Sequence, residues 1–565
     1  MIIGIDLGTT NSAAAVWRDG KAELIPNSLG DYLTPSAVSI SDKGDVLTGM
    51  AARERQSTDP ARTATGFKRL IGTQEKVKLG RKEFLPEDLS SLILASIKAD
   101  AEAFLGEPVE EAVITVPAYF NEQQRRATQK AAQMAGLKVD RLINEPTAAA
   151  LGFGIHELEK EHPFLVFDLG GGTFDVSIVE IFDGIIEVRS SAGDPRLGGL
   201  DFNEAVIALA AEQLGEKVKP LLQNPDCAGV MREAAERARR TLSDHASADF
   251  KFVWQGEEYK TELTADDFEK QAEGLINRLR EPVLRALRDG GIRSKELSEV
   301  VLVGGGTRMP VVRKAVTRLF GRFPNHSLHP DHAVALGAAV QAGLRTRNSD
   351  LKEIRMTDVC PFSLGVDVAE YDQFGNMRSG IFAPIIERNR TIPTSKVNVF
   401  STMADNQREV RFGVYQGEAR HVASNVKLGE IKIKVPPKPA GHVQVECRFS
   451  YDVSGLLEVD ITVPETGQKE QHIFGGEGLE KDDMEQRRAM LAKMKVHPRD
   501  DSLNAAVMAR AKRCFESLLG DERDYVGRLL LAYEGVLDRQ EKREIDEFRE
   551  QLVTELDRIE GERYL

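Results

Sequence analysis

The sequence predicts a multidomain chain in which a duplicated α/β domain is followed by an all-β sandwich and a helical segment. A strand–turn–strand plan occurs twice in the first half, short alternating strands follow it, and helical periodicity ends the chain. A length of 565 residues exceeds what one hydrophobic core usually supports. We expect the α/β domain at 1–348, a linker at 349–361, the sandwich at 362–477 and the helices at 478–565.

The α/β prediction depends on an internal repeat. Residues 2–25 read as a strand, the turn DLGTT, a second strand, an RDG turn and a third strand. Residues 164–190 repeat this order around DLGGGTFD and an FDG turn, and each copy is followed by a further strand, a turn and an amphipathic helix. Apolar β-branched strands that alternate with such helices predict mixed sheets. Two copies predict two lobes that face each other across a cleft, the second beginning at about residue 163.

Glycine-rich turns stand at matching places in the two copies. In Gly8-Thr9-Thr10 and Gly170-Gly171-Gly172-Thr173, missing side chains let backbone N–H groups approach an anion, and hydroxyls add donors. One turn from each lobe would hold a polyphosphate from both sides. Asp6 and Asp168 end the matching strands and Asp175 follows, which suits a magnesium ion bound mostly through water. Ordinary hairpin punctuation is the alternative for either turn alone, and no GxxxxGK[ST] of a Walker-type site occurs.

Composition limits the classes of function. The net charge of −14 argues against a nucleic-acid-binding surface, which is normally basic. Four cysteines lie far apart without a CxxC pair, so neither a zinc site nor a disulfide framework is expected. The first residues do not read as a secretion signal, and no run reaches the roughly 18 apolar residues of a membrane span. We expect a cytoplasmic, bacterial protein with neither nucleic-acid nor membrane partners.

Six motifs in a fixed order carry a specific resemblance: DLGTTNS, VPAYFN, NEPTAAAL, FDLGGGTFDVS, LGGLDF and LVGGGTRMP. Over nearly the whole chain, the sequence resembles the DnaK-type chaperones of the heat shock protein 70 family. The resemblance implies an actin-like, ribonuclease H-like duplicated ATPase domain that binds ATP or ADP with Mg²⁺, and K⁺ as a further ion. It implies an ATP-dependent molecular chaperone. In such a protein, ATP hydrolysis controls the binding of extended apolar segments of unfolded clients, with a J-domain co-chaperone as partner.

The resemblance also assigns roles to residues of the cleft. It implies a catalytic set of Lys68, Glu145, Asp168 and Thr173, in which Lys68 lies at the γ-phosphate and Glu145 helps to position the attacking water. The implied metal residues are Asp6, Asp168 and Asp175. Implied nucleotide contacts are Gly8, Thr9, Thr10, Asn11, Gly170, Gly171, Gly172, Thr173, Gly198, Gly199, Glu236, Arg239, Arg240, Ser243, Gly304, Gly305, Gly306, Arg308 and Asp331. Taken alone, Lys68 reads as a solvated surface charge.

Residues 362–477 have the pattern of a binding module. Alternating segments such as EVRFGVYQ and LLEVDITV are broken by Gly, Pro and Asn turns, as in a β-sandwich, and no acid–base or metal pattern stands out. The resemblance implies an apolar peptide cleft, over which Ala369 and Met403 arch. The implied cleft positions are Val366, Val368, Phe400, Val410, Phe412 and Leu456. Ordinary sandwich core is the alternative for each of them.

From about Gly478 the sequence is charged, with apolar residues every three or four positions, which predicts a small helical bundle. The resemblance makes this bundle the lid over the peptide. Its expected apolar positions are Leu503, Val507, Ala511, Phe515, Leu518, Val526, Leu529 or Leu530, Tyr533, Val536, Ile545, Phe548, Leu552, Leu556 and Ile559.

The implied allosteric residues are Pro146, which relays the nucleotide state, and Arg355 and Asp358 of the linker. The family's linker carries a nearly continuous apolar quartet before its aspartate, whereas this one reads Ile354-Arg355-Met356-Thr357. Arg355 could therefore weaken the coupling between domains, find an acidic partner, or simply face water.

Further departures concern Leu200, which stands where the family has glutamate, and the compact stretches 72–84 and 244–261. Both stretches lie where the family meets its nucleotide-exchange factor, which puts that partner in doubt. With the linker, these departures look like the specialised bacterial HscC branch. A sugar kinase or an actin-like filament protein would share the clamp, but neither needs a sandwich and a lid.

Overall fold

The computed structural model describes residues 1–139, 141–154, 162–182, 185–325, 329–346, 355–371, 376–453, 455–474 and 498–561. The chain forms two compact units. The larger contains residues 1–392 with 415–428, and the smaller contains 393–414 with 429–565. The domain boundaries predicted from the sequence stay predictions.

The first lobe of the larger unit is built on a mixed sheet in the order β11-β10-β1-β2-β3, with β4 paired to β2. Its strands are β1 (Ile2–Asp6), β2 (Asn11–Arg18), β3 (Lys21–Ile25), β4 (Thr34–Pro35), β10 (Glu111–Val116) and β11 (Leu142–Asn144). Two smaller sheets contain β5 (Ala37–Ile40), β6 (Val46–Thr48) and β7 (Thr63–Thr65), and β8 (Val77–Leu79) and β9 (Lys82–Phe84). The helices are α1 (Gly49–Arg53), α2 (Arg55–Thr58), η1 (Pro60–Arg62), η2 (Phe67–Leu70), α3 (Pro86–Leu105), α4 (Glu122–Met134), α5 (Glu145–Gly154) and the later α11 (Ala333–Arg345).

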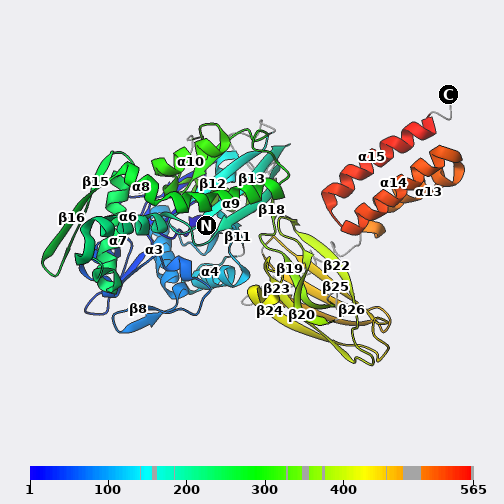
Figure 1. The fold of residues 1–565 in the computed structure, drawn as a ribbon, viewed down its shortest axis with the longest axis horizontal. Helices are drawn as coiled ribbons and strands as arrows, with labels where there is room; N and C mark the ends of the chain where they lie inside the picture. Colours follow the sequence, from blue (N-terminus) through cyan, green and yellow to red (C-terminus); the bar gives the residue numbers. More distant parts are fainter. Residues whose placement is uncertain are drawn as a thin grey trace. The chain divides into compact units, whose positions relative to one another are not determined.

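The second lobe is built on a sheet in the order β17-β12-β13-β14-β18-β21. Its strands are β12 (Phe164–Leu169), β13 (Phe174–Phe182), β14 (Ile185–Asp194), β17 (Val300–Val303), β18 (Arg355–Val359) and β21 (Thr391–Ile392). A separate hairpin contains β15 (Ser247–Trp254) and β16 (Glu257–Thr264). The helices are α6 (Gly199–Leu214), η3 (Gly215–Lys217), η4 (Leu221–Gln223), α7 (Pro225–Thr241), α8 (Ala265–Gln271), α9 (Glu273–Asp289), η5 (Gly305–Arg308) and α10 (Pro310–Phe320). In Figure 1, α9 and α10 lie near β12 and β13, and α6, α7 and α8 lie toward the β15–β16 hairpin.

The predicted repeat has the same strand pairing in both lobes. β1 pairs antiparallel with β2 and parallel with β10, and β12 pairs antiparallel with β13 and parallel with β17. The predicted RDG turn closes the first hairpin with positive φ at Asp19 and Gly20, the geometry that favours Asp-Gly. Residues 183 and 184 of the second predicted turn lie outside the described residues. The matching pairing explains why a polar turn ends the first strand of each lobe at the same edge.

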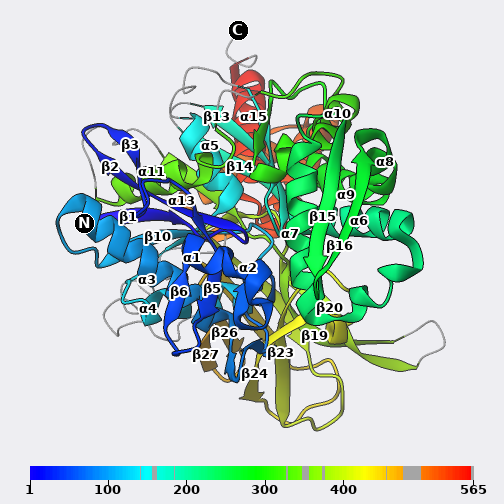
Figure 2. The same cartoon turned by 90° about the vertical axis from the view of Figure 1, so that its left-hand side faces the viewer.

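The spacing of apolar residues and the capping of helix ends explain where the strands and helices of this unit form. All six residues of β12 are buried, as expected for a strand covered on both faces. Helix α4 begins at a reciprocal capping box, in which Asn121 accepts from the Gln124 N–H and Gln124 accepts from the Asn121 N–H, both at 3.0 Å. Separate apolar cores lie under each lobe, and a third joins α5 and α11 to β12, β13 and β14. Figure 2 shows the two lobes as separate halves of this unit, blue and green.

The described end of the predicted linker forms a strand of the second lobe. In β18, Met356 lies opposite Ile186 and Thr357 opposite Glu187 in parallel register with β14. The backbone of Arg355 continues that register opposite Ile185, but its side chain lies outside the described residues. The rest of the predicted linker, 349–354, is also outside them.

The predicted sandwich region contains two four-stranded sheets, in the orders β20-β19-β23-β24 and β22-β25-β26-β27. The strands are β19 (Leu364–Tyr371), β20 (Met377–Ile386), β22 (Thr394–Ser401), β23 (Glu409–Gln416), β24 (Val426–Lys434), β25 (Gln444–Tyr451), β26 (Leu457–Val463) and β27 (Gln468–Phe474), with η7 (Val422–Ser424) between β23 and β24. The alternation of apolar residues therefore predicted strands correctly here.

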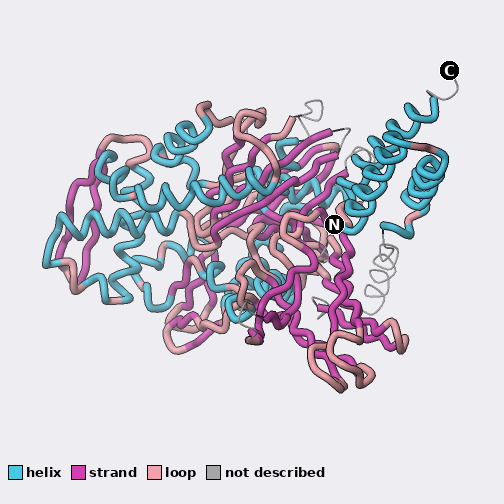
Figure 3. Tube along the Cα trace, turned by 45° about the vertical axis from the view of Figure 1, so that its right-hand side comes forward, coloured by secondary structure: helices cyan, strands magenta, loops and turns pink. Residues whose placement is uncertain are grey.

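The C-terminal segment is helical, as Figure 3 shows. It contains η8 (Pro498–Asp500), α13 (Ser502–Ser517), α14 (Gly520–Arg539) and α15 (Lys542–Gly561). Most of the predicted apolar positions are buried or partly buried in one cluster. Leu503 is an exception and the prediction for it is wrong, because it lies 63% exposed in the first turn of α13. The neighbouring Asn504 is buried instead and accepts hydrogen bonds from Tyr533 and Arg549, both at 2.9 Å.

Candidate functional site

The two predicted glycine-rich turns contact each other. A Cβ on Gly171 would lie 1.9 Å from Oγ1 of Thr10, and a Cβ on Gly172 would lie 2.6 Å from Oγ1 of Thr9. No side chain fits between the lobes at these positions. Because glycine exposes its N–H groups without a covering side chain, each turn can present donors to an anion. The structure therefore brings together the two turns that the repeat placed in separate lobes.

A second pair of glycines covers the turn of the second lobe. The Gly199 N–H donates to the Gly170 carbonyl at 2.9 Å, and the Leu200 N–H donates to the Gly171 carbonyl at 2.8 Å. A Cβ on Gly198 would lie 2.6 Å from the nitrogen of Gly172. Helix α6 begins here, so its positive N-terminal end lies beside the turn. Leu200, the departure from the family pattern, is within contact distance of Gly66, since a Cβ there would lie 3.2 Å from its Cδ1.

A buried ion pair joins two of the predicted catalytic residues. Nζ of Lys68, from η2, donates to Oε1 of Glu145, at the start of α5, over 2.6 Å. Lys68 is 3% exposed and Glu145 is 8% exposed. A buried lysine without a partner would lose its charge, so the carboxylate is what makes this placement tolerable. The alternative of a solvated surface lysine is wrong for Lys68.

Three predicted metal residues lie in the same environment. Asp168 and Asp175 are opposite each other in β12 and β13, and Asp6 ends β1. Oγ1 of Thr115 donates to Asp6 and the Tyr119 N–H donates to Asp175, each at 3.2 Å. The fourth predicted catalytic residue, Thr173, is buried in the turn between β12 and β13. The catalytic and metal sets therefore converge on one site.

The electrostatics of this site favour a cation. Burial, followed by the charge of Glu145, raises the pKa of Asp6 to about 7 and that of Asp175 to about 8. The same two causes raise the pKa of Asp168 well above its usual range. The positive charge of Lys68 opposes these shifts without cancelling them. Carboxyl groups that hold protons near neutral pH for lack of positive charge are suited to receive a metal ion.

The residues fit hydrated magnesium better than a bare ion. Within the described ranges, no three His, Cys, Asp or Glu side chains are placed as direct ligands of one metal. Magnesium usually keeps several of its water molecules and uses few protein carboxylates. The assignment of Asp6, Asp168 and Asp175 to magnesium stays a prediction.

Helix α7 provides the predicted adenosine side. Glu236 accepts from Arg240 at 2.6 Å, and the buried guanidinium of Arg239 donates to Asn203 at 2.7 Å. Burial lowers the pKa of Arg239. The hydroxyl of Ser243 donates to the carbonyl of Arg239 at 3.2 Å. Glu236, Arg239 and Arg240 thus lie in the last turns of α7, and Ser243 lies just after its end.

The loop that follows β17 contains the other predicted nucleotide contacts. Gly304 and Gly306 press on β12, because a Cβ at either would lie within 2.7 Å of the Leu169 carbonyl. A Cβ on Gly305 would lie 2.8 Å from Oδ1 of Asp331. Arg308 donates to Asp331 through Nη2 at 2.6 Å. These four predicted residues and Asp331 therefore form one packed group.

Asn11 begins β2, and its carbonyl lies against Gly8 in the first turn.

Three polar contacts of this site were not predicted from the sequence. Nε of Arg69 donates to the Gly172 carbonyl at 3.0 Å, and its guanidinium also pairs with Asp201. Arg53, in the first lobe, pairs with Glu236 of the second at 2.5 Å. Arg69 follows Lys68 in the same FKRLIG motif, which was the available signal. Nothing in the sequence singled out Arg53 among 75 lysines and arginines.

Asp358, one of the predicted allosteric residues, is bonded to residues next to the catalytic pair. Asp358 of β18 is buried and accepts from Nδ2 of Asn144 at 3.0 Å and from Oγ1 of Thr147 at 3.2 Å. These two donors flank Glu145 and Pro146 in the chain. Burial raises the pKa of Asp358.

A second contact joins the nucleotide lobe to the end of β20. Arg388 donates to Asp289, at the end of α9, through Nε at 2.7 Å, and to Glu418 through Nη1 at 2.7 Å. The Asn389 side chain donates to Asp289 at 2.9 Å and accepts from the Ser191 N–H at 2.8 Å. Asp289 therefore accepts hydrogen bonds from two residues that follow β20 in the chain.

The predicted peptide-cleft residues are divided between the two compact units, and the residues in each unit are described separately. In the larger unit, Val366 is fully buried, while Val368 and Ala369 are partly exposed in β19. In the smaller unit, the rings of Phe400 and Phe412 are 5.5 Å apart. Phe412 and Leu456 are buried there, while Phe400, Val410 and Met403 are partly exposed. Partly exposed apolar residues suit a binding surface, but the cleft itself stays a prediction.

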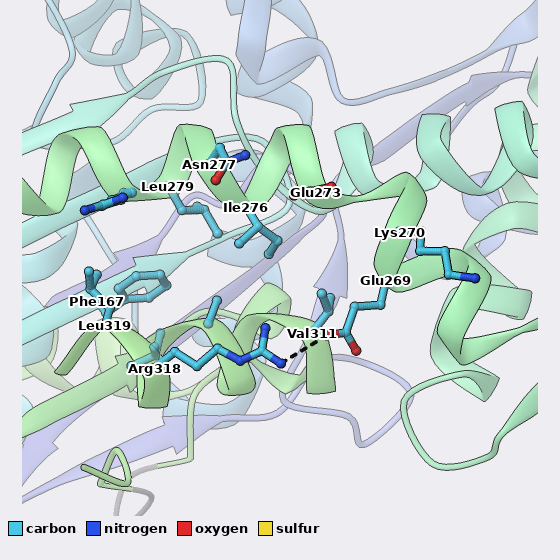
Figure 4. A pocket seen from close by; sticks show the side chains of 13 residues that line it. Phe167, Glu269, Lys270, Glu273, Ile276, Asn277, Leu279, Val311, Arg318 and Leu319 are labelled. Atoms are coloured by element: carbon cyan, nitrogen blue, oxygen red, sulfur yellow. Dashed lines mark ion pairs between the residues drawn. The ribbon is translucent and has the colours of Figure 1, made fainter. Parts of the chain in front are cut away.

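A hollow of about 620 Å³ lies elsewhere in the second lobe, between α8, α9 and α10. Ile276 and Leu279 line it from α9, and Val311 and Leu319 line it from α10 (Figure 4). The guanidinium of Arg318 points across it to Glu269. None of the predicted site residues lines this hollow.

The family comparison agrees with the motifs. Residues 2–564 match the family model described as Hsp70 protein, so the match covers nearly the whole chain. In the part of the chain that the structure describes, no helix is both long enough and apolar enough to cross a membrane.

Proposed function

The chain belongs to the Hsp70 family, and from that premise we propose a site-by-site account of its ATP-driven chaperone cycle. Hsp70 proteins are ATPases that bind ATP or ADP with Mg²⁺. They act as chaperones on unfolded polypeptides and work with J-domain co-chaperones. These general properties hold for the family. The roles of individual residues, the coupling and the branch are the proposal.

The buried pair of Lys68 and Glu145, placed beside the buried Asp168 and Asp175 and the partly buried Asp6, is the observation that carries the proposal. In it, Lys68 stabilises negative charge that develops on the transferred phosphoryl group, and Glu145 orients the attacking water. Thr173 and the two glycine-rich turns donate hydrogen bonds to the phosphates. Magnesium, held by the aspartates through its waters, would neutralise charge on the phosphates. Such catalysis is mostly positioning and electrostatics, so slow turnover is expected.

We assign the nucleoside to the space between α7 and the loop after β17. Glu236, Arg239, Arg240 and Ser243 lie on one side and Gly304, Gly305, Gly306, Arg308 and Asp331 on the other. The pair between Arg53 and Glu236 supports this assignment, since it joins the two lobes beside the proposed ribose site. K⁺ near the phosphates is part of the same proposal.

Coupling between nucleotide and peptide would pass through β18. Asp358 is bonded to both neighbours of Glu145 and Pro146, so a change at the catalytic glutamate can reach the linker directly. Arg355 makes the linker less apolar than the family's. We propose that ATP therefore lowers peptide affinity less than in a typical member. Arg355→Leu should strengthen ATP-driven peptide release and peptide-stimulated hydrolysis together, because linkage is reciprocal. Equal values in wild type and variant would contradict this.

The peptide site of the proposal contains Val366, Val368, Phe400, Val410, Phe412 and Leu456, with Ala369 and Met403 as the arch. An extended client segment would gain main-chain hydrogen bonds, and the apolar pockets would select leucine-like side chains. Leu200, the linker and the compact stretches 72–84 and 244–261 together support placement in the bacterial HscC branch. The proposed location is the cytoplasm, and the proposed dependence on an exchange factor is weak.

ATP turnover with and without an apolar peptide and candidate J-domain proteins tests this function. Slow basal hydrolysis that rises with both additions is expected. Thr173→Ala should slow single-turnover hydrolysis while ADP still binds, and Thr173→Ser should retain most of the rate because it keeps the hydroxyl. Absence of hydrolysis under all conditions, or full activity of Thr173→Ala, would contradict the assignment.

A further inference from the structure

A histidine pair lies behind the proposed adenine wall. Nη2 of Arg308 is 3.2 Å from Nε2 of His329, and the same guanidinium is held by Asp331 through Nε at 3.1 Å and Nη2 at 2.6 Å. Arginine has only donors, so Nε2 of His329 must be the acceptor. This contact therefore requires a neutral imidazole with its proton on Nδ1.

A second imidazole stacks on the first. The rings of His329 and His332 have centroids 3.8 Å apart and an interplanar angle of 19°, and His332 packs edge-on against Tyr32 at 6.0 Å. Two charged rings at this separation would repel each other. Burial, then the charges of His329 and Arg308, lower the pKa of His332, and Asp331 opposes them. Among the described residues, the titratable and charged groups that face the pair are Arg308, Asp331 and Tyr32.

The segment that carries this pair is bonded to the nucleotide loop. The Gly304 N–H donates to the Pro330 carbonyl at 2.9 Å, and Gly305 lies against Asp331. Gly304 in turn lies against Asp168, since a Cβ there would be 2.7 Å from the Asp168 carboxylate. A change in the charge of His329 thus acts on Arg308 directly and on a loop that contacts the catalytic strand.

We propose that His329 is a positioning residue, which in its neutral form holds Arg308 against the nucleobase and on protonation releases it. Acidification would protonate Nε2 of His329, so that this atom donates instead of accepting. The positive imidazolium would then repel the guanidinium of Arg308. Adenine-nucleotide affinity would therefore fall on acidification, because the contact between Nε2 of His329 and Arg308 requires a neutral ring. This inference rests on the proposed function, because it takes Arg308 as part of the ATP site.

His329 is exposed, so solvent screens the effect. Contacts between exposed charged groups are worth up to about 1 kcal/mol, which corresponds to a change of about three- to fivefold in affinity. Asp6, whose pKa is raised to about 7, and the phosphates of the ligand also change protonation between pH 5.5 and 7.5. Their contribution is common to all variants, so the informative quantity is the difference between variants.

The experiment measures the Kd of a fluorescent ADP with Mg²⁺ for the full chain at pH 7.5 and 5.5. His329→Gln keeps an acceptor near the position of Nε2 but does not titrate, and His329→Ala removes the acceptor. We expect wild type to lose about three- to fivefold more affinity on acidification than His329→Gln. His329→Gln should match wild type at pH 7.5, and His329→Ala should bind more weakly there.

Three results would overturn the inference. An acid loss in His329→Gln equal to that of wild type would show that His329 does not titrate against Arg308. Wild-type affinity of His329→Ala at pH 7.5 would show that the contact does not position Arg308. A wild-type chain that binds no adenine nucleotide at either pH would overturn the proposed function and this inference with it, whereas the first two results would leave the function standing.

Discussion

Replacing Lys68 with methionine should separate the catalytic contribution of this lysine from its structural one. Methionine keeps the length of the side chain and removes its charge. Lys68 is 3% exposed and bonded to Glu145 at 2.6 Å, so the change leaves a buried carboxylate without its partner. We expect Lys68→Met to abolish single-turnover ATP hydrolysis and to destabilise the larger unit.

The magnitude follows from the burial of the pair. Removing one partner of a buried ion pair costs about 3–5 kcal/mol, because the other charge stays buried and uncompensated. We therefore expect Lys68→Met to lower the free energy of unfolding by about 3–5 kcal/mol.

Glu145→Gln in the Lys68→Met background is the matched control. It removes the unpaired charge while keeping shape, so stability should return toward wild type while hydrolysis stays absent. The two tryptophans, Trp17 and Trp254, both lie in the larger unit, so urea unfolding followed by tryptophan fluorescence reports on that unit. Recovered hydrolysis in the double variant, or wild-type stability in Lys68→Met, would refute the reasoning.

Four further outcomes are expected. Burial raises the pKa of Asp175 to about 8 from 3.8. The contribution of this carboxyl to the stability of the nucleotide-free protein should therefore be greatest below about pH 4 and be lost as pH rises through 8. Asp175→Asn should flatten the dependence of urea unfolding on pH between 6 and 9. Arg388→Ala should reduce peptide-stimulated hydrolysis severalfold while basal hydrolysis persists, and an unchanged stimulation would contradict its link to Asp289. Met403→Ala should raise the off-rate of a fluorescent peptide severalfold and Met403→Leu much less, and equal off-rates would refute the arch. With compact stretches at 72–84 and 244–261, stopped-flow ADP release should be fast without an exchange factor, and slow release that a bacterial exchange factor accelerates would argue against this.

The parts of the site that the sequence predicted are those whose geometry is local. A turn that must bring backbone N–H groups close to an anion needs glycine at particular positions, and Gly171 and Gly172 were identifiable for that reason. The repeat then placed one such turn in each lobe. Asp6 and Asp168 followed, because both end the first strand of a repeat. The need for glycine in the turns and the repeat of the strand pattern were together sufficient to predict these residues.

The contacts that the sequence did not predict are long-range pairings of common residue types. Arg53 and Glu236 are 183 positions apart, and Arg388 and Asp289 are 99 apart. In a chain with 89 acidic residues, charge alone cannot identify which acid a given arginine meets. Leu503 shows a different limit. Its three- and four-residue spacing is correct, but the first turn of a helix extends beyond the surface that covers the rest, so Leu503 stays exposed.

The contacts of Asp358 are the part of the structure on which the proposed coupling between the linker and the catalytic pair rests. Coupling energies between sites are typically about 1–3 kcal/mol, and a hydrogen bond to a charged group contributes about 1.5–3 kcal/mol. Asp358 accepts two such bonds, from Asn144 and Thr147, and both lie within two residues of Glu145 in the chain. If β18 left the sheet, both donors would lose their acceptor, and the segment that holds Glu145 would lose its fixed position. In the proposed coupling, these two bonds are what links the position of β18 to the position of Glu145.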